Sequence, residues 1–192
     1  VLSAQIEGTQ ASMSDLINYQ AGAGPVEKRD DVQEVQNYIE GVNYGLEKLG
    51  ELPICVRLIR GMHRRILNGA RGESRDPGAL RKIQNYIGPP GCTAETATYV
   101  PPPPGRVQDL LSEMEKFIHE DQRYPVLIRA ALVHQQFESI HPFLDGNGRV
   151  GRLLVTLMLI DDGSLKQPSL YLSDYFKRNR QAYYHALQRV RD

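Results

Sequence analysis

A short segment that disfavours helix runs directly into one that strongly favours a buried helix. Gly146 and Gly148 flank Asn147 and disfavour helix, whereas the residues that follow, 149–160, strongly favour it. The leucines and the methionine within that segment are apolar over a wide arc, which is typical of a helix at the centre of a core. We therefore expect the chain to fold around this helix, with the turn leading into its N-terminus.

Helical periodicity recurs along most of the remaining chain. Apolar residues spaced three and four apart form stripes, and a glycine or an Asn-Gly pair follows the first two of them. Those first two helices should pack as an antiparallel pair. The predicted helices cover residues 32–49, 53–66, 107–118, 126–140, 149–160 and 172–190. The fold class is mainly α, with about seven or eight helices in all.

The helical period disappears between Arg71 and Pro104, where prolines, glycines and threonines dominate. Two short segments, 82–87 and 96–100, flank Gly-Pro-Pro-Gly and predict a small β-hairpin with an irregular loop. The four prolines that follow lack backbone donors and should form an extended exit from the hairpin.

Composition limits the classes of partner. The chain has 192 residues, 41% of them hydrophobic, which suits a single core. Lysine plus arginine and aspartate plus glutamate both total 23, so no overall field attracts nucleic acid or an anionic membrane. The longest apolar stretch, 153–160, is far below the roughly 20 residues of a membrane span, and no secretory leader is visible.

Cysteine spacing and the chain ends add two expectations. Cys55 and Cys92 lack the spacing of a zinc or redox pair, which favours a reducing, cytoplasmic location. The chain starts at Val1 and stops at Asp192 inside a helical pattern, so we expect a fragment with flanking domains missing. The remaining histidines have no metal-ligand spacing and are interpreted as structural or surface groups: His63, His119, His134 and His185.

The turn carries the groups that transfer of a phosphate-containing group requires. Residues 141–152 read His-Pro-Phe-Leu-Asp-Gly-Asn-Gly-Arg-Val-Gly-Arg. His141 has an unperturbed pKa of about 6.5 and can accept a proton at neutral pH, while the carboxylate of Asp145 suits Mg²⁺. Arg149 and Arg152 share one helical face beside a helix N-terminus, which attracts anions. Each residue alone favours a structural role, but their joint order predicts a polyphosphate site. No Walker-type loop or kinase signature is present.

The whole run matches the signature of Fic-domain proteins, His-x-Phe-x-Asp/Glu-Gly-Asn-Gly-Arg-x-x-Arg. The predicted hairpin also resembles the Fic flap, and Tyr183-Tyr184 resembles the tyrosine pair of the family's last core helix. The resemblance covers essentially the whole chain. It implies the Fic fold, which is a helical core with a short β-hairpin flap.

The resemblance also implies an activity, the transfer of AMP from ATP to a serine, threonine or tyrosine hydroxyl of a protein, with release of pyrophosphate. His141 would deprotonate that hydroxyl. Asp145 would be the Mg²⁺ ligand, and Gly146, Asn147 and Gly148 would form an anion hole. Arg149 and Arg152 would orient the β- and γ-phosphates. Ile87 and Gly88 on the flap would border the nucleotide, and Tyr183 and Tyr184 would line the ribose and adenine pocket.

A second motif lies near the start of the chain. Leu2, Ile6, Met13 and Ile17 form an apolar face that predicts an amphipathic helix. The six residues from Ser3, Ser-Ala-Gln-Ile-Glu-Gly, match Ser/Thr-x-x-x-Glu-Gly/Asn, the inhibitory-helix motif of Fic proteins. The resemblance implies that Glu7 pairs with Arg152 and displaces the γ-phosphate of ATP. Residues 1–20 would then form the inhibitory helix region, and residues 21–192 the Fic core.

The expected partners are a protein target docked on the flap and the chain itself, with a homodimer suggested by resemblance alone. Neither nucleic acid nor membrane is expected. Removal of AMP from modified targets is a further activity in the family. Two alternatives stay open: a catalytically quiet nucleotide-binding regulatory module, and a Fic enzyme that transfers another group, such as UMP or phosphocholine. An intact His141 favours the enzyme. Phosphate transfer, as in the Doc branch, is disfavoured by the standard Gly-Asn-Gly and second arginine.

Overall fold

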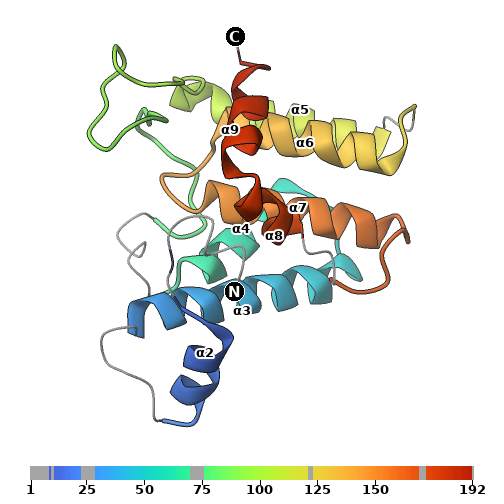
Figure 1. The fold of residues 1–192 in the computed structure, drawn as a ribbon. Coiled ribbons are helices and arrows are strands. Elements are labelled where there is room, and N and C mark those ends of the chain that lie inside the picture. The colour runs from blue at the N-terminus through green and yellow to red at the C-terminus, as the bar shows by residue number, and fades with distance from the viewer. Residues whose placement is uncertain are drawn as a thin grey trace.

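The computed structural model describes residues 9, 11–22, 29–69, 76–120, 123–168 and 172–191. Helices dominate, as the sequence predicts (Figure 1). Their bounds are α2 Met13–Gln20, α3 Arg29–Leu49, α4 Val56–Ile66, α5 Val107–Glu120, α6 Val126–Ile140, α7 Asn147–Asp161, α8 Leu172–Arg178 and α9 Arg180–Gln188, with a 3₁₀ turn, η3, at Pro104–Arg106. No helix among these described residues is long and apolar enough to cross a membrane.

Helix α7 lies at the centre of the core. It packs along α6 on one side and against α3 and α4 on the other (Figure 1). Nearly every residue from Asn147 to Leu159 is buried, including Arg149 and Arg152. The wide apolar arc therefore predicted the position of this helix correctly.

Helices α3 and α4 form the predicted antiparallel pair, and glycines bring their backbones close together. A Cβ at Gly41 would lie 2.6 Å from Ile66 Cγ1, and a Cβ at Gly45 would lie 2.9 Å from Met62 Sδ. Contacts of 41 with 66 and of 45 with 62 run in opposite directions along the two helices. Both glycines are buried because any side chain there would separate α3 from α4.

The predicted flap hairpin is not formed by strands in the described residues. Ile87 and Tyr99 exchange both backbone hydrogen bonds at 3.0 Å as one isolated antiparallel bridge. Pairing stops there because prolines at 89, 90 and 101–104 have no N–H to donate to a ladder. The flap is therefore an irregular loop closed by a single bridge.

Two helix predictions need correction. The segment 172–190 is not one helix, since it breaks at Asn179, whose side-chain amide donates to Tyr175 O at 3.0 Å. Asparagine favours such local bonds at helix ends. Val190, the last residue of the predicted helix, is 64% exposed.

The second correction concerns the apolar face predicted near the start of the chain, which the structure describes only at residue 9 and from residue 11 onward. α2 begins after Ser12, which forms a capping box with Asp15. Its buried side is built by Ala11 and Leu16 against α3, whereas Ile17, predicted on the apolar face, is 59% exposed. Residues 1–8 and 10 lie outside the described part of the chain.

Replacing Gly41 with valine should lower the free energy of unfolding by about 1–3 kcal/mol, because overpacking a close interface costs that much. Urea denaturation followed by circular dichroism measures it. Gly105→Val is the matched control, since a Cβ at Gly105 meets nothing within 4 Å. Equal stability of Gly41→Val and the wild type would contradict the close α3–α4 contact.

Candidate active site

A sharp corner joins α6 to α7 and contains the signature residues. Helix α6 ends at His141, which adopts the left-handed conformation with φ 47°. Helix α7 begins after Gly146, with φ 72°. A left-handed histidine is uncommon and indicates that the surroundings hold the backbone there. The turn thus places an imidazole at the end of one helix and, at the start of the next, amides that have no acceptor within their own helix.

Asn147 holds the corner closed through its side chain. Its Oδ1 accepts from Phe143 N at 2.9 Å, and its Nδ2 donates to Phe143 O at 2.9 Å. Phe143 itself is fully buried and stacks on the ring of His63 with centroids 3.7 Å apart. The side-chain amide of Asn147 therefore maintains the loop. Only the backbone N–H of Asn147 can then make the predicted contribution to an anion hole.

His63, interpreted from sequence as a structural histidine, supports the corner from α4. Gly78 N donates to Nδ1 at 2.8 Å, so Nδ1 is the acceptor and Nε2 carries the proton. Nε2 then donates to Asp145 O at 3.0 Å. Burial lowers the pKa of His63 to about 4, and the nearby Arg149 charge acts in the same direction. The imidazole is neutral near pH 7 and connects the segment that precedes the flap to the loop that contains Asp145.

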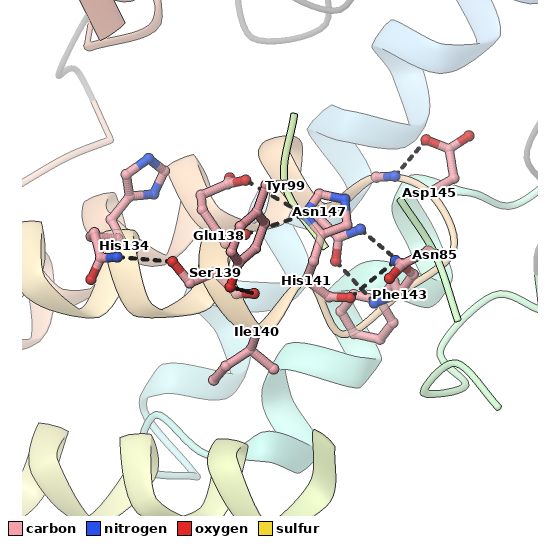
Figure 2. Close-up of polar contacts among 12 residues, drawn as sticks. Asn85, Tyr99, His134, Glu138, Ser139, Ile140, His141, Phe143, Asp145 and Asn147 are labelled. Atoms are coloured by element: carbon pink, nitrogen blue, oxygen red, sulfur yellow. Dashed lines mark hydrogen bonds and ion pairs between the residues drawn. The ribbon is translucent and has the colours of Figure 1, made fainter. Parts of the chain in front are cut away.

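One ring nitrogen of His141 already has a hydrogen-bond partner (Figure 2). Its Nδ1 lies 3.3 Å from the carbonyl oxygen of Glu138, and 4.0 Å from the Oε2 of the same residue. Burial lowers the pKa of His141 to about 4, assisted by the positive charges of Arg191 and Arg81. A neutral ring with Nδ1–H donating to the carbonyl leaves Nε2 as a free proton acceptor.

A pocket of about 320 Å³ opens at the corner. It is lined by Ile87, Glu138, His141, Leu144, Asp145, Gly146, Asn147, Gly148, Arg152, Tyr183, Tyr184, Leu187 and Arg191. The structure thus brings together the predicted nucleotide-site residues except two, Gly88 and Arg149. Their individual roles stay predictions.

Arg149 lies beside the pocket and interacts with Asp145. Its Nη2 is 3.4 Å from Asp145 Oδ1, which also accepts from Gly146 N at 2.5 Å. Asp145 is about half exposed, with 46% of its side chain accessible. Both of its side-chain contacts in the described part of the chain use Oδ1, and the carboxylate lies at the rim of the pocket. No cluster of three or more His, Cys, Asp or Glu side chains forms a metal site among the described residues.

The tyrosine pair closes the other side of the pocket. Tyr183 is 8% exposed, and its hydroxyl is 2.8 Å from Nε2 of His134. Burial raises the pKa of Tyr183 above its usual value, so the phenol stays neutral. Tyr184 is 44% exposed, and its ring centroid lies 5.3 Å from that of Tyr183.

Sequence reasoning missed several residues around the corner. Glu138, Leu144, Leu187 and Arg191 line the pocket, and Gly151 lets Glu138 fit, because a Cβ there would lie 2.8 Å from Glu138 Oε1. These residues carry no pattern of their own beyond helical spacing. The one signal for Glu138 is its place three residues before His141, on a helix that packs against α7.

Stability should fall in acid because of His63. Its folded pKa, about 4, lies below the unfolded value, so the unfolded chain binds more protons between about pH 6.5 and 4, and stability is lost as pH falls through that window. The loss from this residue between pH 7 and 5 is about 2 kcal/mol. Urea unfolding of His63→Gln should show a correspondingly smaller pH dependence, with exposed His185→Gln as control. The same pH dependence in His63→Gln and the wild type would refute this assignment.

Comparison with known proteins agrees with this geometry. The Fic/DOC family model matches residues 53–159, and the Fic/DOC N-terminal model matches residues 1–47. Protein adenylyltransferase Fic of Drosophila ananassae is 33% identical over 141 residues, which is 72% of this chain and 25% of the relative; that of Drosophila melanogaster is 32% identical over the same length. The chain thus spans about a quarter of these curated relatives.

Solved structures show the same fold. A Fic family protein from Desulfovibrio desulfuricans G20 superposes with a TM-score of 0.79 over 97% of this chain and 54% of its own, at 24% identity. A Fic domain containing signalling protein from Bacteroides thetaiotaomicron VPI-5482 superposes with a TM-score of 0.71 over 84% of this chain and 60% of its own, at 23% identity. The signature residues line a pocket, and the Fic/DOC family model matches more than half of the chain. The chain therefore belongs to the Fic/DOC family.

Proposed function

We propose that this chain transfers AMP from ATP to a hydroxyl group of a protein, including its own. The observation that carries the proposal is the pocket that joins a neutral His141 to the N-terminus of α7 and to the guanidinium of Arg152. The curated relatives, named protein adenylyltransferases, support the same reaction.

His141 would be the general base. Its Nε2 takes the proton of a serine, threonine or tyrosine hydroxyl while that oxygen bonds to the α-phosphorus. The bond from the α-phosphorus to the bridging oxygen breaks, and pyrophosphate leaves with the electron pair. Because the pKa of His141 is lowered to about 4, the ring is in the accepting form throughout the neutral range. A positioned base contributes about 10²–10⁴ in rate.

The phosphates would be held by backbone and arginine. The first amides of α7 have no acceptor within the helix, and the helix dipole favours anions there. Arg152 is 3% exposed and lines the pocket, so its charge acts in a poorly solvated setting. These groups bind the oxygens on which negative charge increases during the reaction.

Asp145 fits the role of Mg²⁺ ligand. Protein sites for this ion commonly use one or two carboxylates together with phosphate oxygens, and Asp145 offers a half-exposed carboxylate at the pocket rim. When bound, Mg²⁺ would neutralise charge on the phosphates. Arg149 sets the orientation of the carboxylate through its contact with Oδ1.

The remaining pocket walls suit the nucleoside and the target. Tyr183, Tyr184 and Leu187 would contact ribose and adenine, since aromatic faces and aliphatic groups suit a flat base. Ile87 lies at the flap bridge beside the pocket. A target segment would pair with the flap backbone there, which places its hydroxyl near His141.

Glu7 would restrain the reaction. The proposal is that its carboxylate pairs with Arg152 and excludes the reactive γ-phosphate pose. Glu7 and Ser3 lie outside the described residues, but Thr9, two positions later, is 6% exposed and donates to Glu34 of α3 at 2.6 Å. That bond would anchor the inhibitory segment to the core.

Glu7→Gly should raise self-AMPylation at least tenfold because it removes the competitor for Arg152, a gain that corresponds to about 1.4 kcal/mol. Adding His141→Ala should abolish the gain. Labelled ATP with Mg²⁺, followed by gel autoradiography and mass spectrometry, measures both. Glu40→Gly, an exposed glutamate of α3, is the matched control.

Equal labelling of wild type and Glu7→Gly would reject autoinhibition. ATP binding without label in either protein would instead favour a nucleotide-binding module. Transfer from labelled UTP in preference to ATP would favour a Fic enzyme that moves another group.

A further inference from the structure

Arg81 is a buried cation between the flap and the catalytic corner. It is 3% exposed, although it belongs to an irregular segment rather than to a helix. Its Nε donates to His141 O at 2.9 Å, and its Nη2 donates to Ile140 O at 3.2 Å. Its backbone N donates to Pro142 O at 2.9 Å. One residue thus bonds three successive carbonyls, with that of His141 in the middle.

The same guanidinium reaches both arms of the flap. Its Nη2 donates to Pro102 O, where the chain leaves the flap, and its Nη1 is 3.4 Å from Ile83 O, where the chain enters it. The flap closes between these points at the bridge of Ile87 with Tyr99. Arg81 therefore links the start of the flap, its end and the end of α6.

The chemistry of the corner explains why arginine is suited to this position. The last carbonyls of a helix have no intrahelical donor, and the C-terminal end of the dipole favours a cation. Arginine offers five N–H donors in a planar fork, which a lysine ammonium cannot reproduce. Burial lowers the pKa of Arg81, but the side chain keeps its charge near neutral pH.

Asn85, from the same segment, extends this row of donors. Its Nδ2 is 3.0 Å from Phe143 O and 3.3 Å from His141 O (Figure 2). The carbonyls of residues 140–143 thus all accept from the segment that leads into the flap. These hydrogen bonds hold the backbone of His141 in its left-handed conformation, and the side chain of His141 lines the pocket.

We propose that Arg81 is a positioning residue that fixes the imidazole of His141 relative to the flap, so that the base and a docked target hydroxyl keep their geometry. The catalytic part of this inference rests on the function proposed above. In the described structure the hydrogen bonds of Arg81 do not involve the pocket residues that would bind phosphate or adenine, namely Arg152, Tyr183 and the first turn of α7. Loss of Arg81 should therefore reduce the rate while Mg-ATP binding is retained.

The first test measures rate and binding separately in the full chain carrying Glu7→Gly. Arg81→Ala should lower the first-order rate of self-AMPylation about 10²-fold, because a misplacement of about 1 Å costs that much. The Kd for Mg-ATP, from calorimetry, should change less than threefold. Methylguanidinium should restore at least a tenth of the rate by filling the cavity, whereas methylammonium should not. Arg106→Ala, at a 3₁₀ turn and exposed, is the matched control.

The second test does not depend on activity. In the unmodified chain, ¹⁵N-detected histidine spectra should show His141 as the single Nδ1–H tautomer, with well-separated nitrogen shifts. In Arg81→Ala, and in Arg81→Lys if the alanine variant does not fold, the two shifts should approach each other as tautomers mix. If no variant transfers AMP, the proposed function fails and this spectrum alone decides the inference.

Three results would overturn the inference. They are a wild-type rate in Arg81→Ala, a loss of rate that follows the loss of Mg-ATP binding without methylguanidinium rescue, and unchanged His141 nitrogen shifts in the folded variant. Each result would show that Arg81 only stabilises the fold and does not position His141.

Discussion

The carbonyl groups at the α6–α7 corner set the central constraint of this structure. Helix α6 and the buried helix α7 meet through a six-residue turn, and the carbonyls at the end of α6 need donors from outside the helix. The donors come from Arg81 just before the flap, from Asn85 in its first arm and from Asn147 at the end of the turn. Because those donors arrive from segments far apart in sequence, the flap, the turn and the central helix are fixed together.

Electrostatics follows from that arrangement. Burial and two guanidiniums keep His141 neutral, which suits a proton acceptor. Arg152, only eleven positions further along the chain, is buried and lines the same pocket, where its charge suits an anion. The pocket thus combines a neutral imidazole with a buried guanidinium, and both come from one short stretch of sequence. Gly151 between them makes the close approach of α6 and α7 possible.

The sequence predicted these features unevenly, for physical reasons. The central helix and the α3–α4 pair followed from periodicity, because burial imposes it. The pocket residues of the signature followed from its fixed order. The hairpin was overpredicted, because the apolar residues around Ile87 suggest strands while the surrounding prolines remove the donors. Arg81 could not be found, since its hydrogen bonds to a distant segment leave no local pattern.

The place of the ATP phosphates is tested most directly by a crystal structure of the chain carrying Glu7→Gly with Mg²⁺ and a non-hydrolysable ATP analogue. We predict an α-phosphate against the first amides of α7, Arg152 on the outer phosphates and Nε2 of His141 facing the α-phosphorus. A nucleotide bound elsewhere, or one whose α-phosphate lies on the far side of the pocket from His141, would contradict the account.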